Sequence, residues 1–93
     1  MMTDNDTEML RKQIETIDEQ IIDLIATRLE IADELAKAKK SSSQGYWDEN
    51  KEHDVVKRYQ KLCEEVNLTP GEACQIAETI LMISKERQRH YFE

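Results

Sequence analysis

The segment TEMLRKQIETIDEQIIDLIATRLEIADELAKAKK, residues 7–40, decides the fold of this chain. Large apolar residues recur in it at alternating steps of four and three, the pattern of an amphipathic helix with a buried apolar stripe. These residues are Leu10, Ile14, Ile17, Ile21, Leu24, Ile31 and Leu35. Because neither Gly nor Pro interrupts the segment, we expect one continuous helix over about residues 6–41.

The expected helix is longer than a globule of this size. At about 1.5 Å per residue it spans roughly 50 Å. A compact chain of 93 residues has a diameter of only about 30 Å. The ends of the helix therefore need a partner, and we expect that partner to be a second copy of the chain.

One position of the apolar stripe is occupied by a cation. Arg28 stands between Leu24 and Ile31, and Lys39 follows eleven residues later, within about 20° of Arg28 around the helix axis. Burying a cation is costly unless an anion or good hydrogen bonds compensate. Each residue alone is compatible with a structural ion pair, or with an alkyl stem lying along apolar surface. Two cations on one inward face favour a bound anion.

The composition predicts a single all-α domain over residues 1–93. Apolar residues make up 39% of the chain and charged residues 35%, and there are only two Gly and one Pro. One chain of this size buries a marginal core, which oligomerisation would extend. The formal net charge of −7 argues against nucleic acid or an anionic membrane surface as a partner. A local cluster of Arg and Lys can still bind a small anion.

The sequence also predicts where the protein works and which sites it lacks. It shows no signal peptide and no apolar run of about 18 residues, so we expect a soluble, cytoplasmic protein. Cys63 and Cys74 lack metal-type spacing and are expected to be free thiols in a reducing compartment. Without a zinc spacing, a Gly-rich phosphate loop or a Ser/His/Asp arrangement, we expect no metal site.

A serine-rich loop is expected to reverse the chain before a second helix over about residues 48–66. Tyr46 and Trp47 should pack at the start of this helix, and Asp48 is well placed as its N-cap. Extending the apolar stripe of the helix backward by one turn leads to Glu52. That carboxylate either stabilises the helix dipole or accepts a hydrogen bond from something bound.

The sequence Thr-Pro-Gly-Glu at residues 69–72 predicts the start of a third helix, over about residues 70–91. It combines a capping box with Pro at the first helical position. The apolar face of this helix continues into Ser84 and Gln88, which lie one turn apart and share a face. Either this end of the helix is simply exposed to solvent, or the two polar groups face a ligand.

Arg11 lies beside the apolar stripe of the first helix. Its spacing suits a surface ion pair with Glu15. It precedes Arg28 by 17 residues, about 25 Å along the axis. One small ligand cannot contact both arginines of one helix, but it can contact Arg28 of one chain and Arg11 of another.

Five polar residues interrupt or extend the apolar faces of the three helices: Arg28, Lys39, Glu52, Ser84 and Gln88. If they converge, they form a cavity with two cations, one carboxylate and two neutral hydrogen-bonding groups. Such a cavity suits a small polyanion that carries a hydroxyl group and a further acceptor oxygen. None of the five is an obvious nucleophile, so catalysis here would depend on positioning and electrostatics.

Several short blocks have a recognisable spacing: Leu10-Arg11-x-x-Ile14-x-x-x-Asp18, Ala26-Thr27-Arg28 with Ile31-Ala32, Lys37-Ala38-Lys39, Asp48-x-x-x-Glu52 and Ser84-x-x-x-Gln88. Together they resemble the short, stand-alone members of the all-helical (AroQ-type) chorismate mutases, from about Leu10 to Tyr91. Each block alone is weakly specific, but polar positions at these separations are specific as a set.

The resemblance implies a three-helix chain that forms an intertwined homodimer with two active sites. The reaction would be the Claisen rearrangement of chorismate to prephenate, toward phenylalanine and tyrosine. It is pericyclic, so the resemblance implies no covalent intermediate, metal or cofactor. Each site would take one residue, Arg11, from the partner chain. The remaining residues would come from one chain: Arg28, Lys39, Asp48, Lys51, Glu52, Ser84 and Gln88.

The resemblance also implies roles for four side chains that donate hydrogen bonds. Arg11 and Arg28 would hold the two carboxylates of the substrate and fold it into its reactive shape, because an arginine makes bidentate contacts that a lysine cannot. Lys39 and Gln88 would donate to the ether oxygen, where negative charge develops as the C–O bond breaks.

The other site residues would bind the periphery of the substrate. Glu52 would accept from the ring hydroxyl, with help from the backbone near Asp48, and Ser84 would support a carboxylate. Lys51 departs from the family pattern, because members commonly have arginine there. A lysine keeps the charge but loses the fork, which predicts weaker substrate binding.

Two other functions fit the sequence. An isochorismate-pyruvate lyase would use a similar cationic pocket, and the loop over residues 41–47, which resembles no family motif, would decide between the two enzymes. A catalytically silent helical dimer would act as a regulatory or interaction module. Arg28, Lys39 and Gln88 argue against the silent module, which would have no reason to keep cations on its apolar stripe.

Overall fold

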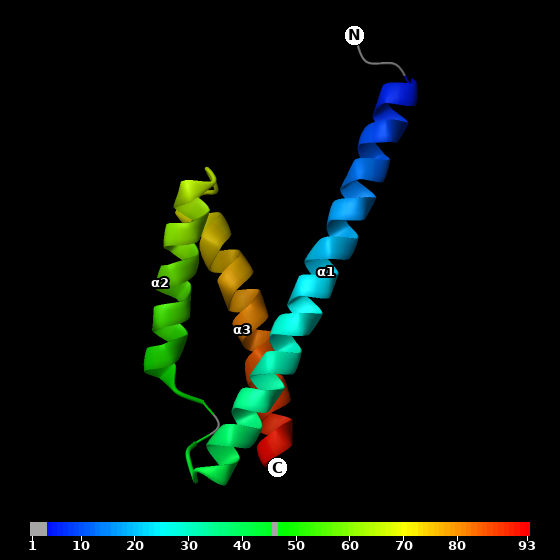
Figure 1. The fold of residues 1–93 in the computed structure, drawn as a ribbon. Helices are drawn as coiled ribbons and strands as arrows, with labels where there is room; N and C mark the ends of the chain where they lie inside the picture. Colours follow the sequence, from blue (N-terminus) through cyan, green and yellow to red (C-terminus); the bar gives the residue numbers. More distant parts are fainter. Residues whose placement is uncertain (1–3, 46) are drawn as a thin grey trace. The chain divides into compact units, whose positions relative to one another are not determined.

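The computed structural model describes residues 4–45 and 47–93, and in this part of the chain it has three α-helices and no strand. The helices are α1 (Asp4–Ser41), α2 (Glu49–Glu65) and α3 (Pro70–Phe92), shown in Figure 1. The predicted all-α, three-helix chain is confirmed, and each helix begins and ends within two residues of its predicted bounds. The prediction that Tyr46 packs at the start of the second helix falls outside the described residues.

The chain divides into two compact units, residues 1–30 and residues 31–93. The described part of the first unit is a single stretch of α1. Its apolar stripe is exposed throughout, from Leu10 to Leu24. In the described part of this unit, therefore, the large residues of the stripe are exposed.

The second unit holds the end of α1 together with α2 and α3. The last two helices pack against each other as an antiparallel hairpin, which Figure 1 shows in green and orange. Apart from Leu81, the buried apolar residues in the described part of this unit are small: Ala36, Cys63, Ala73 and Ala77. Small side chains let the helices approach closely, but they remove little apolar area from water, so the core of this unit is marginal.

Local signals fix the beginnings of α2 and α3. The Asp48 side chain caps α2, and α3 begins at Pro70 with the complete capping box of Thr69 and Glu72. The Glu72 backbone N–H donates to Thr69 Oγ1 at 3.1 Å, and the Thr69 backbone N–H donates to Glu72 Oε1 at 2.8 Å. This second hydrogen bond lowers the pKa of the Glu72 carboxyl. Both predicted caps are confirmed.

The C-terminal ends of α1 and α2 use the same turn without glycine. Ser43 has a φ of 61° and Asn67 a φ of 63°, the left-handed region that glycine usually occupies. After α1, the Gln44 backbone N–H donates to the Lys39 carbonyl at 2.8 Å, and the Ser43 N–H donates to the Lys40 carbonyl at 3.2 Å. This is the hydrogen-bond pattern of the Schellman motif.

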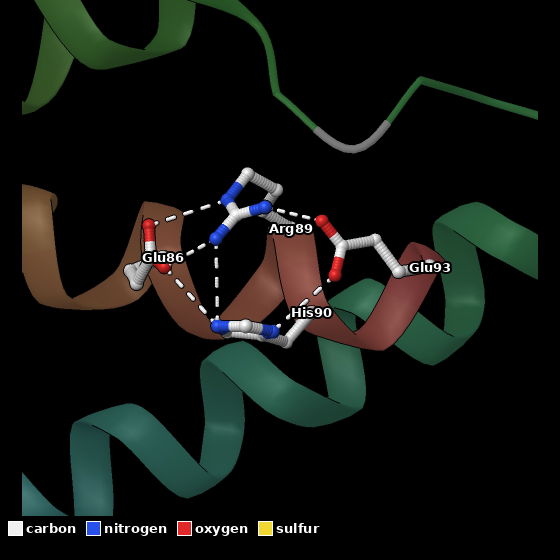
Figure 2. Close-up of polar contacts among 4 residues, drawn as sticks. All are labelled: Glu86, Arg89, His90 and Glu93. Carbon is white, nitrogen blue, oxygen red and sulfur yellow. Dashed lines mark hydrogen bonds and ion pairs between the residues drawn. The ribbon is translucent and has the colours of Figure 1, made fainter.

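Two groups of charged contacts lie on the surface of α3. Arg87 forms a two-pronged contact with the Asp33 carboxylate and so joins α3 to the end of α1. Figure 2 shows the second group near the C-terminus, where Arg89 lies between Glu86 and Glu93, with the His90 ring beside all three. Because these groups are partly exposed, each contact adds little stability.

Candidate active site

Lys39 and Gln88 meet in the second unit, where the end of α1 lies against α3. Lys39 Nζ donates to Gln88 Oε1 at 3.2 Å. Gln88 is only 4% exposed and Ser84, one turn before it, only 2% exposed, whereas Lys39 is half-buried. The structure therefore brings together three of the residues that the sequence singled out. The alternative, in which this end of α3 simply faces solvent, is wrong for Ser84 and Gln88.

The periodicity of α3 explains this burial. Ala77, Leu81, Ser84 and Gln88 follow one another at steps of four, three and four, so they form one stripe along the helix. All four are buried. The stripe is apolar in its first half and polar in its second half, and Lys39 contacts the polar half. Polar groups gathered at one end of an apolar core are typical of a site that orients a polar ligand.

Glu52 and Lys39 are connected through Trp47. The indole Nε1–H of Trp47 donates to Glu52 Oε2 at 2.9 Å. The centre of the Trp47 ring lies 6.0 Å from Lys39 Nζ and 5.6 Å from Lys85 Nζ. At these distances the π-face of an aromatic ring attracts a cation. The site thus extends from Gln88 through Lys39 and Trp47 to Glu52.

Sequence reasoning assigns Trp47 only a packing role at the start of the second helix and does not predict its hydrogen bond to Glu52. One signal was present: the only tryptophan of the chain lies five residues before the glutamate, next to the N-cap. Sequence reasoning does not single out Lys85 either. In the structure it is half-buried and contacts the same ring.

Asp48 and Lys51 lie at the start of α2. Asp48 Oδ1 accepts hydrogen bonds from the backbone N–H groups of Asn50 and Lys51, at 2.9 and 3.4 Å. Its carboxylate therefore fixes the first turn of the helix that carries Glu52. The Lys51 residue itself is exposed.

Arg11 and Arg28 belong to the first unit, residues 1–30. Arg11 is exposed and forms an ion pair with Glu8, with Nη1 and Oε2 3.9 Å apart, whereas its spacing suggested Glu15. Arg28 is half-buried. The contacts that define the site are thus those of residues 39–88 in the second unit.

The contacts in the second unit can stabilise a negatively charged ligand without forming a bond to it. An ammonium group and an amide lie within hydrogen-bond distance of each other, so both can approach one acceptor atom. Among the described residues there is no group of three or more His, Cys, Asp or Glu that could hold a metal ion. No helix in residues 4–45 or 47–93 is long and apolar enough to cross a membrane.

Comparison with known proteins identifies the family. The chorismate mutase type II family matches residues 10–89, which includes every residue of the predicted site. A chorismate mutase of Methanocaldococcus jannaschii is 31% identical over 84 residues, covering 90% of this chain and 85% of that protein. No solved structure matches. Because both matches span most of the chain, it belongs to the chorismate mutase type II family, and its activity is that of a chorismate mutase, an isomerase.

Proposed function

We propose that two copies of the chain form an intertwined homodimer, in which each active site rearranges chorismate to prephenate for the synthesis of phenylalanine and tyrosine. The buried contact of Lys39 with Gln88 carries this proposal, since a lysine and an amide at the end of a core suit a site for developing negative charge. One side of the site comes from residues 39–88 of one chain. The partner chain supplies Arg11.

The exposed stripe of α1 supports the homodimer. Ile14 is 57% exposed and Leu24 70% exposed, and the stripe between them is exposed as well. Fully burying one such side chain stabilises a protein by about 1.5–3 kcal/mol, so an uncovered row of them is a strong driving force for association. A second copy offers an equal stripe, and a two-fold axis would pair them.

Pairing of the two stripes would bring Arg11 of each chain to the site of its partner. It lies next to Leu10, at the start of the stripe, about 25 Å before Arg28 along the helix. In the homodimer, Arg28 of one chain and Arg11 of the other hold the two carboxylates of chorismate. Clamping both carboxylates selects the compact, chair-like conformer in which the two reacting carbons lie close together.

The rearrangement breaks a C–O bond and forms a C–C bond in one concerted step. Negative charge develops on the ether oxygen as its bond to carbon lengthens. Lys39 Nζ and Gln88 Nε2 donate to that oxygen and stabilise the transition state more than the bound substrate. The ammonium group contributes most, because hydrogen bonds from charged donors are stronger than those from neutral donors.

The remaining groups orient the ring. Glu52 accepts a hydrogen bond from the ring hydroxyl, next to the backbone of the first turn of α2 that Asp48 caps. Ser84 supports a substrate carboxylate from the buried stripe of α3. Lys51 adds positive charge at the rim without the bidentate geometry of arginine, which weakens its hold on a carboxylate.

A spectroscopic assay tests the reaction and its main donor together. Loss of chorismate, and in a parallel assay loss of isochorismate, is followed by ultraviolet absorbance, and the products are identified as prephenate or as pyruvate plus an aromatic acid. Pyruvate plus an aromatic acid formed from isochorismate would indicate the lyase reaction instead. Lys39→Ala should lower kcat by more than tenfold with a smaller effect on KM, because the loss of one donor to developing charge costs about 2.7–4 kcal/mol.

Lys40→Ala is the matched control for that experiment. Lys40 is the next residue in α1, carries the same charge, and contacts Tyr91 near the C-terminus of α3 instead of the site. It should keep nearly the wild-type kcat. A Lys39→Ala enzyme with more than about a tenth of the wild-type kcat would remove Lys39 from the catalytic role.

A further inference from the structure

Trp47 contacts two residues with opposite charges and different proposed tasks. Its indole N–H donates to Glu52 at 2.9 Å, and its ring lies 6.0 Å from Lys39 Nζ. These contacts connect the acceptor for the ring hydroxyl of the substrate to the donor for the ether oxygen. It is the only tryptophan in the chain.

The hydrogen bond leaves Glu52 able to bind substrate. A carboxylate has two oxygens and about four acceptor positions, and the indole N–H uses one position, on Oε2. A glutamate side chain is flexible, and ordering it during binding costs conformational entropy. An N–H that already holds one oxygen reduces that cost and directs the rest of the carboxylate.

The backbone on both sides of this contact is fixed. Trp47 immediately precedes Asp48, and the Asp48 carboxylate accepts from two backbone N–H groups in the first turn of α2. The Glu52 N–H in turn donates to the Asp48 carbonyl at 3.1 Å. The carboxylate is therefore held on the first turn of α2, and the indole belongs to the residue just before the N-cap of that turn. The ammonium groups of Lys39 and Lys85 also lie within cation–π distance of the ring.

We propose that Trp47 is a positioning residue, which orders the Glu52 carboxylate for the ring hydroxyl and so contributes to the selection of the hydroxylated substrate. This inference rests on the proposed role of Glu52 as the acceptor for that hydroxyl. Trp47 would act through its indole N–H, so this role can be tested separately from the packing of its ring. Phenylalanine keeps a ring near the lysines but has no N–H, which makes Trp47→Phe the informative variant.

The experiment compares kcat/KM for chorismate with kcat/KM for an analogue that carries hydrogen in place of the ring hydroxyl. The ratio of the two values reports recognition of the hydroxyl. Trp47→Phe should lower this ratio by roughly five- to tenfold, about the effect of one hydrogen bond of ordinary net strength. The loss should appear as a higher KM for chorismate with a similar kcat, because the hydroxyl does not react. The analogue should be converted at nearly the wild-type rate.

Glu52→Ala and the double variant separate the proposed role of Trp47 from the proposed role of Glu52. Glu52→Ala should lower the ratio at least as far, and adding Trp47→Phe should lower it no further, because the indole acts through the carboxylate. A lowered ratio in Glu52→Ala with an unchanged ratio in Trp47→Phe overturns the inference and leaves the proposed function intact. An unchanged ratio in Glu52→Ala overturns the proposed role of Glu52 itself.

Lys85→Gln is the matched control for the ring. Lys85, like Lys39, contacts the π-face of the indole, with Nζ 5.6 Å from the ring centre. The indole N–H donates to Glu52 instead. This variant should keep the wild-type ratio. A drop in Lys85→Gln equal to that in Trp47→Phe would assign the effect to ring placement and overturn the role of the N–H. Thermal unfolding of each variant, followed by circular dichroism, confirms that the folded enzymes are compared.

Discussion

Gln88 accepts a hydrogen bond from Lys39 through Oε1, at 3.2 Å, although 49 residues separate the two in sequence. The contact joins the end of α1 to the buried stripe of α3. It places a neutral amide beside an ammonium group at the point where we propose that the ether oxygen of chorismate binds. This arrangement makes the charge state at position 88 decisive for catalysis.

The variant Gln88→Glu should make the reaction dependent on low pH. An amide donates at any pH, but a carboxyl group donates only when protonated, and its ionised form repels negative charge on the ether oxygen. The neighbouring Lys39 stabilises the ionised form, so activity should rise as the pH falls from 8 to 5 and continue to rise below 5. The pH profile of kcat/KM measures this directly.

Gln75→Glu is the matched control for the pH profile. Gln75 lies on the same helix and is exposed, so the same change of charge there should leave the wild-type profile in place. If Gln88→Glu is as active at pH 8 as at pH 5, Gln88 does not face the ether oxygen.

Mixing two inactive variants should restore activity through shared sites. Arg11→Ala and Arg28→Ala should each be nearly inactive alone. In their heterodimer, one site combines the intact Arg28 of one chain with the intact Arg11 of the other, and the second site lacks both. Refolding an equal mixture gives about half heterodimers for a two-fold dimer, each with one good site of two, so activity should return to about a quarter of wild type.

The control mixture combines Arg28→Ala with Lys39→Ala. In the proposed dimer both residues of a site come from the same chain, so each site of this heterodimer lacks one of them, and activity should not return. Subunit exchange is verified with differently tagged chains. If heterodimers of the first mixture form and remain inactive, Arg11 does not serve the partner's site.

Replacing Ser43 with glycine should stabilise the protein. Ser43 follows α1 with a φ of 61°, where a side chain costs about 1 kcal/mol and glycine costs less. Ser43→Gly should therefore raise the midpoint of thermal unfolding by a few degrees, since about 1 kcal/mol corresponds to roughly 4–8 °C for a small domain. Calorimetry at equal protein concentration measures the shift.

Ser42→Gly is the control for this effect. Among the described residues only Ser43 and Asn67 combine a side chain with positive φ, so glycine at position 42 gains no relief and only adds freedom to the unfolded chain. It should lower the midpoint. A lower midpoint for Ser43→Gly as well would show that the turn after α1 does not strain the serine.

The Asp33–Arg87 ion pair should contribute to stability at neutral pH but not in acid. The side-chain hydrogen bonds from Arg87 lower the pKa of the Asp33 carboxyl. A carboxyl with a lowered folded-state pKa stabilises the fold above its ordinary pKa of about 3.9, and that contribution disappears as the pH falls through the lowered value. Since the pair is partly exposed and screened, it is worth about 0.2–1 kcal/mol.

Urea unfolding at pH 7 and at pH 2 tests the ion pair. Asp33→Asn should lower the free energy of unfolding at pH 7 and make a smaller difference at pH 2. Asp54→Asn, the same exchange at an exposed position of α2, should change neither value appreciably. An equal loss at both pH values in Asp33→Asn would indicate that packing, and not charge, is responsible.

Local sequence patterns are sufficient to predict the three helices and to name most of the candidate site residues. Helix formation depends on interactions within a few residues, so the periodic stripe of α1 and the Thr69–Glu72 capping box were sufficient to place the helices. The polar residues that interrupt those stripes can be recognised because they break the same periodic pattern. Lys39, Ser84 and Gln88 could be named before any packing was known.

Which of these groups meet depends on how the helices pack in three dimensions. Whether Ser84 and Gln88 are buried depends on the end of α1 packing against α3, and whether Trp47 reaches Glu52 depends on how the loop enters α2. Contacts of this kind are set by the path of the chain between helices, which a periodic pattern does not encode. The left-handed conformation of Ser43 could not be predicted for a related reason, because serine has no preference for positive φ that would indicate it.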